Sequence, residues 1–197
     1  MITVALALLA APPTFHAAKA QARVLDRPAA AVAAMVGACE VVDGAVSGEC
    51  LENTKGLKDE VTGKKVALDL GSGYEALLSY GGGTGAKTRF VWGPLYDVGN
   101  GLALTVGKPQ KISESGNVVV GKRPIDGTSP DDLMELDLRR LASTGALGIE
   151  VVGKFGKTWA MSGGGKAVKG VSFEVEALRL YNVRSGATVF ESTQALK

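Results

Sequence analysis

The chain has 197 residues, of which 46% are hydrophobic and 21% charged, and its formal net charge is +2. This length allows one ordinary domain or two very small ones, and so small an excess of positive charge argues against a dedicated nucleic-acid-binding protein. The 27 glycines follow no Gly-X-Y period. They indicate tight turns between short strands rather than a collagen-like or long helical protein.

Residues 1–22 have the features of a secretory signal peptide. Residues 2–11 form an apolar run, and the small-residue motifs Ala18-Lys19-Ala20 and Ala20-Gln21-Ala22 follow it. The run is too short to span a bilayer, which takes about 20 apolar residues. We therefore expect a periplasmic or secreted protein without a transmembrane segment, cleaved after Ala20 or Ala22. A buried N-terminal helix is the alternative.

Residues 23–47 are expected to contain a short helix, from Pro28 to Cys39, and a disulfide. Cys39 and Cys50 are the only cysteines, and an oxidising compartment would favour a local bond between them. A loop of that length contributes roughly 2–3 kcal/mol by constraining the unfolded chain. A competing hypothesis is lipidation of Cys39, because residues 36–39 resemble the end of a lipoprotein box.

The rest of the chain is predicted to consist mainly of short strands. One helix is expected from about residue 48 to 61, and another at 133–141 after the start signal Ser129-Pro130. Strands are expected at 66–70, 74–80, 89–96, 102–106, 118–120, 149–155, 158–161, 171–181 and 188–191. Several glycines and prolines make residues 107–130 a connector with one strand inside it.

A shift of the sequence by 82 positions indicates an internal duplication. The shift pairs Thr62-Gly63 with Thr144-Gly145, and the glycine triplet 81–83 with 163–165. We therefore predict two related β-rich units, at 48–106 and 131–197. The expected fold class is mainly β with two or three short helices (α+β). Its strands would form antiparallel sheets or a small barrel from duplicated helix-plus-four-strand units. An OB-like barrel in the C-terminal half is the alternative.

Histidine chemistry is excluded if the signal peptide is removed, because His16 is the only histidine. A chain without histidine has no Ser-His-Asp or Cys-His machinery and no His-ligated metal. We predict no catalytic residues, no metal and no cofactor on this basis. Hydrolases that use paired carboxylates are not excluded.

The segment from Val66 to Glu75 resembles the first motif of class I SAM-dependent methyltransferases. In that motif a buried strand ends in an acid, here Asp69, and a Gly-x-Gly loop follows, here Gly71-Ser72-Gly73. The resemblance implies a nucleotide-binding loop that opens a helix. Only five residues separate Glu75 from the next glycines, and Glu75 stands where the family has a third glycine. A strand–turn–strand hairpin is the interpretation we favour.

Two acidic groups are candidates for paired carboxylates. Asp131, Asp132, Glu135 and Asp137 fall at the start of a predicted helix, where the helix dipole favours acids. Glu174 and Glu176 alternate on a predicted strand, as solvated positions do on a sheet with one wet face. Neither pattern requires a catalytic role.

The C-terminal unit is mildly basic and also contains aromatic residues. If the two kinds of side chain share a face, they could hold an anionic ligand such as a surface glycan or a lipid headgroup. The weak ligand-site candidates are Lys157, Trp159, Arg179 and Tyr181. We therefore expect a non-enzymatic binding or structural protein of the cell envelope. The alternatives are a carboxylate-based hydrolase acting on an extracellular polymer and a SAM-dependent methyltransferase.

Overall fold

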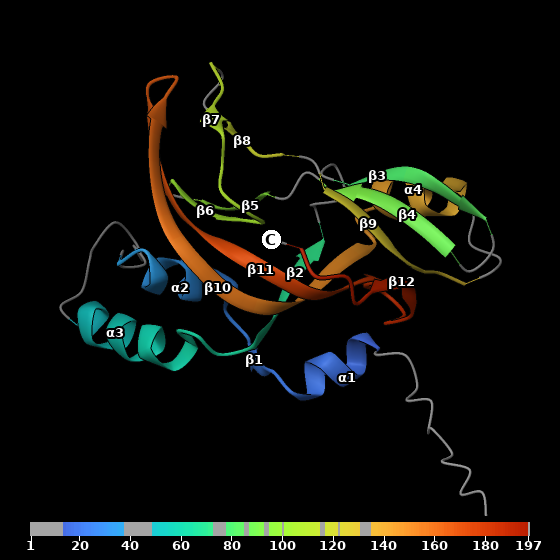
Figure 1. Cartoon of the computed structure of the whole chain (residues 1–197), viewed down its shortest axis with the longest axis horizontal. Coiled ribbons are helices and arrows are strands. Elements are labelled where there is room, and N and C mark those ends of the chain that lie inside the picture. The colour runs from blue at the N-terminus through green and yellow to red at the C-terminus, as the bar shows by residue number, and fades with distance from the viewer. Residues whose placement is uncertain are drawn as a thin grey trace, which may run out of the picture.

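A curved sheet of ten strands forms the body of the molecule, with short helices packed against it (Figure 1). The structure is a computed structural model. It describes residues 14–37, 49–72, 78–84, 87–92, 95–99, 101–114, 117–121, 123–130 and 135–196.

The four helices of the described residues are α1 (Phe15–Ala20), α2 (Pro28–Met35), α3 (Glu49–Val61) and α4 (Glu135–Ser143). Local sequence explains where they begin and end. Thr14 caps α1 by accepting a hydrogen bond from the Ala17 amide, and Pro28 occupies the first turn of α2. Gly63 and Gly145, which follow α3 and α4, both have positive φ angles, which favour glycine at a helix C-terminus.

The strands are β1 (Arg23–Leu25), β2 (Val66–Ser72), β3 (Leu78–Thr84), β4 (Lys87–Trp92), β5 (Leu95–Gly99), β6 (Leu102–Thr105), β7 (Lys111–Ile112), β8 (Val118–Val119), β9 (Arg123–Thr128), β10 (Leu147–Gly163), β11 (Lys166–Asn182) and β12 (Thr188–Ser192). The order across the large sheet is β1-β2-β10-β11-β12-β9-β4-β3. Two pairings, β1 with β2 and β6 with β11, are parallel. β7 and β8 form a separate hairpin.

The hairpin of β10 and β11 is the centre of the sheet, and each of its strands has 17 residues. The register shifts between Val152 and Gly153 and again between Phe155 and Thr158. Bulges of this kind bend a strand and increase its twist, which accounts for the curvature of the hairpin in Figure 1. The sequence predicted two strands, at 149–155 and 158–161. They are one strand with the second bulge between them.

One edge of β11 pairs with β10, and two different strands pair with its other edge. β12 pairs with its end, from Leu178 to Tyr181, whereas β6 pairs with its beginning, from Lys169 to Ser172. β12 also contacts β9, but the only register pair recorded between them is Glu191 with Thr128. The strands β9, β4 and β3 therefore join the rest of the sheet through a narrow connection.

Alternation along the central strands divides the core between the two faces of the sheet. Val151, Leu178 and Leu68 belong to the main core, to which α2, α3 and α4 also contribute. The neighbouring positions Val152, Ala177 and Ala67 form a smaller cluster on the opposite face, together with Phe15 of α1. Successive side chains of a strand point to opposite faces, so this sheet is covered on both sides.

The prediction of a mainly β protein with a few short helices is confirmed, and the sheet is antiparallel with two parallel pairings. The barrel alternatives, including the OB-like barrel, are wrong, because the strand order runs from β1 to β3 without closing. Residues 107–130, expected as a connector with one strand, contain β7, β8 and β9. The duplication stays a prediction. Its two Thr-Gly helix ends match, but glycines 81–83 lie within β3 whereas 164–165 form a turn.

Candidate functional site

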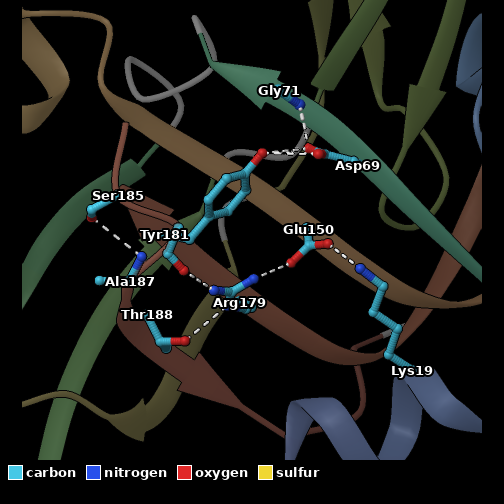
Figure 2. A network of polar contacts seen from close by, with 10 residues as sticks. Lys19, Asp69, Gly71, Glu150, Arg179, Tyr181, Ser185, Ala187 and Thr188 are labelled. Atoms are coloured by element: carbon cyan, nitrogen blue, oxygen red, sulfur yellow. Dashed lines mark hydrogen bonds and ion pairs between the residues drawn. The ribbon is translucent and has the colours of Figure 1, made fainter. Parts of the chain in front are cut away.

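A row of charged side chains crosses three strands on the face of the sheet that α1 covers. Glu150 of β10 is the register partner of Asp69 on β2 and of Arg179 on β11. Lys19 reaches the row from α1, and Tyr181 lies two residues beyond Arg179 (Figure 2). We call these five residues, Lys19, Asp69, Glu150, Arg179 and Tyr181, the Glu150 cluster.

Glu150 is the buried centre of the cluster, with a side chain only 8% exposed. One carboxylate oxygen accepts from Lys19 Nζ at 2.5 Å and the other from Arg179 Nη1 at 2.6 Å. Burial alone would raise the pKa of Glu150, but the hydrogen bonds from Lys19 and Arg179 outweigh burial, and the pKa lies below its ordinary value. Glu150 is therefore ionised at neutral pH, and each of its carboxylate oxygens binds one cation.

Arg179 connects Glu150 to the turn between β11 and β12. Its Nε donates to Thr188 Oγ1 at 2.8 Å, and its Nη2 donates to the Gly186 carbonyl oxygen. The guanidinium carbon also lies 5.0 Å from the centre of the Tyr181 ring, a distance at which a cation and an aromatic face attract each other. The planar guanidinium thus holds a strand, a turn and a ring in one arrangement, a geometry that lysine does not offer.

Tyr181 crosses over β10 to reach Asp69. Its hydroxyl donates to the carboxylate, with both oxygens at 2.9 Å. The crossing depends on Gly148, because a Cβ at that position would lie 2.5 Å from two ring carbons of Tyr181. Burial, followed by the hydrogen bond to Asp69, raises the pKa of Tyr181 to about 12. The phenol is therefore protonated near neutral pH.

These geometries make the Glu150 cluster a structural network and not a centre for proton transfer. A general acid or base works best with a pKa near the operating pH. Glu150 is shifted to lower pKa and Tyr181 to higher pKa, so both move away from neutrality. The cations are directed at protein acceptors. What the network does is fasten α1, β2, β10, β11 and the turn after β11 to one another.

The structure brings two of the four predicted ligand-site residues together. Arg179 and Tyr181 are neighbours in the Glu150 cluster. Trp159 lies nine residues beyond Glu150 along β10, which is about 30 Å of extended strand. Its Nε1 donates to Thr105 Oγ1 at 3.1 Å, and its ring lies over Gly170. The four residues do not form one site.

Lys157, the fourth candidate, lies in the bulged part of β10. From Lys154 to Gly163 the recorded register partners of β10 are all on β11, so its other edge is unpaired in the described residues. Lysines and bulges are the features with which proteins protect such edges from pairing with another chain. Lys157 is exposed, so its position on this edge is explained without a ligand.

Other sequence motifs have ordinary structural explanations. Val66–Ser72 is strand β2, and Gly71 has a positive φ where the register with β10 shifts. Residues 73–77 lie outside the described residues. The strand–turn–strand hairpin predicted here is wrong, because β2 pairs with β1 and β10 whereas β3 pairs with β4. Glu176 forms an ion pair with Lys65 at 2.6 Å, and Glu174 lies opposite Lys154. Asp131 and Asp132 of the predicted acidic cluster lie outside the described residues. Cys39 lies outside them too, so the Cys39–Cys50 disulfide stays a prediction.

One open cleft lies where β9 and β12 separate. It has a volume of about 440 Å³ and is lined by Asp126–Thr128 and Glu191–Gln194. One of its carboxylates, Asp126, is held in an ion pair. Arg89 binds Asp126 through two hydrogen bonds, of 2.6 and 3.2 Å, and the hydrogen bond lowers the pKa of Asp126. A glycosidase acid needs a raised pKa instead.

Lys19 and Glu150 were not predicted from the sequence as site residues. Glu150 had a detectable signal, because it is the one charged residue in the apolar run from Leu147 to Val152. An acid within a buried strand predicts a cationic partner. Lys19 could not be identified as that partner, since it is 131 positions away and falls in the segment assigned to the signal peptide.

Among the described residues, no group of three or more His, Cys, Asp or Glu side chains is arranged to hold a metal ion. In the same part of the chain, no helix is long and apolar enough to cross a membrane. Comparisons with curated proteins and with solved structures give no match. A comparison with protein families matches residues 1–191 of the chain. By that match, which covers nearly the whole sequence, the chain belongs to DUF6066, a family of unknown function.

Proposed function

We propose that this chain is an exported, non-enzymatic protein that binds an anionic membrane surface of the cell envelope. The binding surface is the basic arm, which we define as residues 108–119 and 157–169. The described residues of the arm, which are all but 115 and 116, comprise strands β7 and β8, the residues just before β7, and the tip of the β10–β11 hairpin. Strands β7 and β8 and this tip project from the same side of the sheet (Figure 1). They are in contact, because a Cβ at Gly163 would lie 3.0 Å from Ile112 Cβ.

The single observation that carries the proposal is the charge of the basic arm. It contains five lysines and one glutamate, whereas the whole chain has a formal net charge of only +2. All five lysines are exposed: Lys108, Lys111, Lys157, Lys166 and Lys169. The positive charge of the protein is therefore concentrated in the arm. A basic segment near an anionic lipid surface gains about 1 kcal/mol for each Lys or Arg.

A lipid surface suits the arm better than an anionic polysaccharide does. Lysines act as point charges toward phosphate and need no shaped pocket. Exposed Ala160 and Ala167 and half-buried Met161 lie among them, and such side chains are compatible with the headgroup boundary. The one aromatic side chain described in the arm, Trp159, already donates its N–H to Thr105. It therefore lacks the free polar group that a sugar-binding platform uses.

Flotation with vesicles tests the proposal. We expect the protein to float with vesicles rich in phosphatidylglycerol at low salt, and to be released as salt screens the attraction. It should not float with phosphatidylcholine alone. Replacing Lys111, Lys166 and Lys169 by Glu should abolish flotation. The matched control replaces the exposed Lys55, Lys58 and Lys64 near the end of α3 and changes the net charge equally. Equal loss in both variants, or no flotation of the unmodified protein, would contradict the proposal.

Export is the second part of the proposal, and the apolar run at residues 2–11 supports it. An oxidising compartment would allow the Cys39–Cys50 disulfide, which we retain as part of the proposal. The test is to fractionate cells and measure the intact mass of the protein before and after reduction. Protein outside the cytosol whose mass rises by two hydrogens on reduction is the expected result. Cytosolic protein would refute export, and a lipid-sized mass on Cys39 would refute the disulfide.

A further inference from the structure

We propose that the segment Thr14–Ala22 is a permanent part of the exported protein, so that any leader is cleaved before Thr14 and not after Ala20 or Ala22. The inference rests on the proposed export and changes the expected processing site. It also means that His16 is kept, exposed on α1. The evidence is how the segment contacts the sheet.

Phe15 anchors the segment in the smaller core cluster. Its side chain is completely buried, against Ala67 of β2, Val152 of β10 and Ala177 of β11. Two of these three residues are alanines, and their small side chains leave the space that the phenyl ring fills. Ala18 and Ala22 pack against the same cluster. Cleavage after Ala20 or Ala22 would remove Phe15 and expose this apolar surface.

Lys19 provides a second and chemically different anchor. Its ion pair with Glu150 supplies one of the two cations that bind a carboxylate whose side chain is 8% exposed. Without Lys19, the charge of Glu150 would be compensated by Arg179 alone. A signal peptide that is removed from the protein is not expected to supply the counter-ion of a buried carboxylate.

The backbone continues from α1 directly into the sheet. Arg23 donates its amide to the Lys65 carbonyl, and Arg23 to Leu25 pair in parallel with Val66 to Leu68. Removing the residues before Arg23 would turn the start of this edge strand into a free chain end. The segment and β1 thus form one continuous connection across the face of the sheet.

The first test is the N-terminus of the natural protein. The unmodified gene is expressed in its own host, the protein is purified from outside the cytosol, and intact mass spectrometry gives its first residue. A first residue at or before Thr14 is the expected result. A protein that begins at Gln21 or Arg23 would overturn the inference and leave the proposed export standing. Protein found only in the cytosol would refute the export proposal instead.

The second test measures whether Phe15 contributes to the exported fold. Phe15→Ala is introduced into the full chain, and the melting temperature of the purified exported protein is compared with that of His16→Ala, its exposed neighbour. If the segment is retained, Phe15→Ala should lower the Tm by about 10 °C and His16→Ala should leave it unchanged. If the segment is removed, neither variant can change the Tm.

Discussion

Lys19 Nζ and Glu150 Oε1 lie 2.5 Å apart although the two residues are 131 positions apart in the sequence. This ion pair joins helix α1 to the middle of the sheet. Its partner ion pair, from Arg179 to the same carboxylate, joins two strands. The two cations do not contribute equally, because the Lys19 side chain is 32% exposed and the Arg179 side chain 12% exposed.

The first prediction follows from that difference in exposure. Lys19→Met should lower the free energy of unfolding by about 1 kcal/mol, since Arg179 remains to compensate Glu150. Arg179→Met should cost about 3 kcal/mol or more, because Glu150, Thr188 and the Gly186 carbonyl lose a partner together. Urea unfolding of the two variants measures both quantities. A larger loss of unfolding free energy in Lys19→Met than in Arg179→Met would contradict the prediction that Arg179 is the more important partner of Glu150.

The second prediction concerns acid. The pKa of Glu150 is lowered in the folded protein, so this group contributes stability above its unfolded pKa, roughly 4.3. The contribution is lost as the pH falls through the lower folded pKa. The unfolding free energy of the unmodified protein should therefore fall below about pH 4.5. Glu150→Gln should be less stable at pH 7 and should show a smaller further loss in acid. Parallel slopes for the two proteins would contradict the prediction.

The third prediction concerns alkali. The pKa of Tyr181 is raised to about 12 in the folded protein, above its unfolded value of about 10. Its contribution is complete below about pH 10 and is lost as the pH rises through the folded pKa. Tyr181→Phe removes the hydrogen bond to Asp69 and should cost about 1 kcal/mol at pH 7. Between pH 10 and 12 its stability should fall less than that of the unmodified protein. Thermal unfolding at several pH values provides the measurement.

The fourth prediction uses two glycines. Gly148→Ala would place a Cβ 2.5 Å from the Tyr181 ring, so the ring must move away from Asp69, at a cost of about 1–3 kcal/mol. The matched control is Gly56→Ala in the exposed middle of α3, where a Cβ meets nothing within 4 Å. That change should stabilise the protein by about 0.5–1 kcal/mol. In Tyr181→Phe the cost of Gly148→Ala should change, because the two residues are in contact. Strictly additive effects would contradict the proposed crossing.

The sequence predicts much of the fold wherever a local signal is strong. Val66-Ala-Leu is an apolar run and forms β2, and the Thr-Gly pairs mark where α3 and α4 end. Strand β9 was missed because it contains Pro124 and Gly127, which usually interrupt strands. Gly127 is required here, since a Cβ would overlap the Phe190 ring and the Glu191 carbonyl. The need for glycine at this position comes from the neighbouring strand β12, so the residues around Gly127 in the sequence do not reveal it.

The candidate site was predicted less well, for a related reason. Arg179 and Tyr181 alternate on one strand, so their proximity can be inferred from the sequence. Their partners Glu150, Asp69 and Lys19 come from three other elements, and only the folded arrangement brings them together. Helix α1 was assigned to the signal peptide because alanine-rich sequence beside an apolar run is typical of a cleavage region. Composition does not reveal that Phe15 has a place in the core.

The central position of β10 has a consequence for the timing of folding. β2 obtains its antiparallel partner only when Leu147 to Gly163 have been made. At about 5–20 residues per second, β10 leaves the ribosome roughly 4–16 seconds after β2. During that interval the N-terminal half has no template on which to assemble the main sheet. Under the proposed export, this delay would help to keep the nascent chain unfolded for passage through a translocation channel.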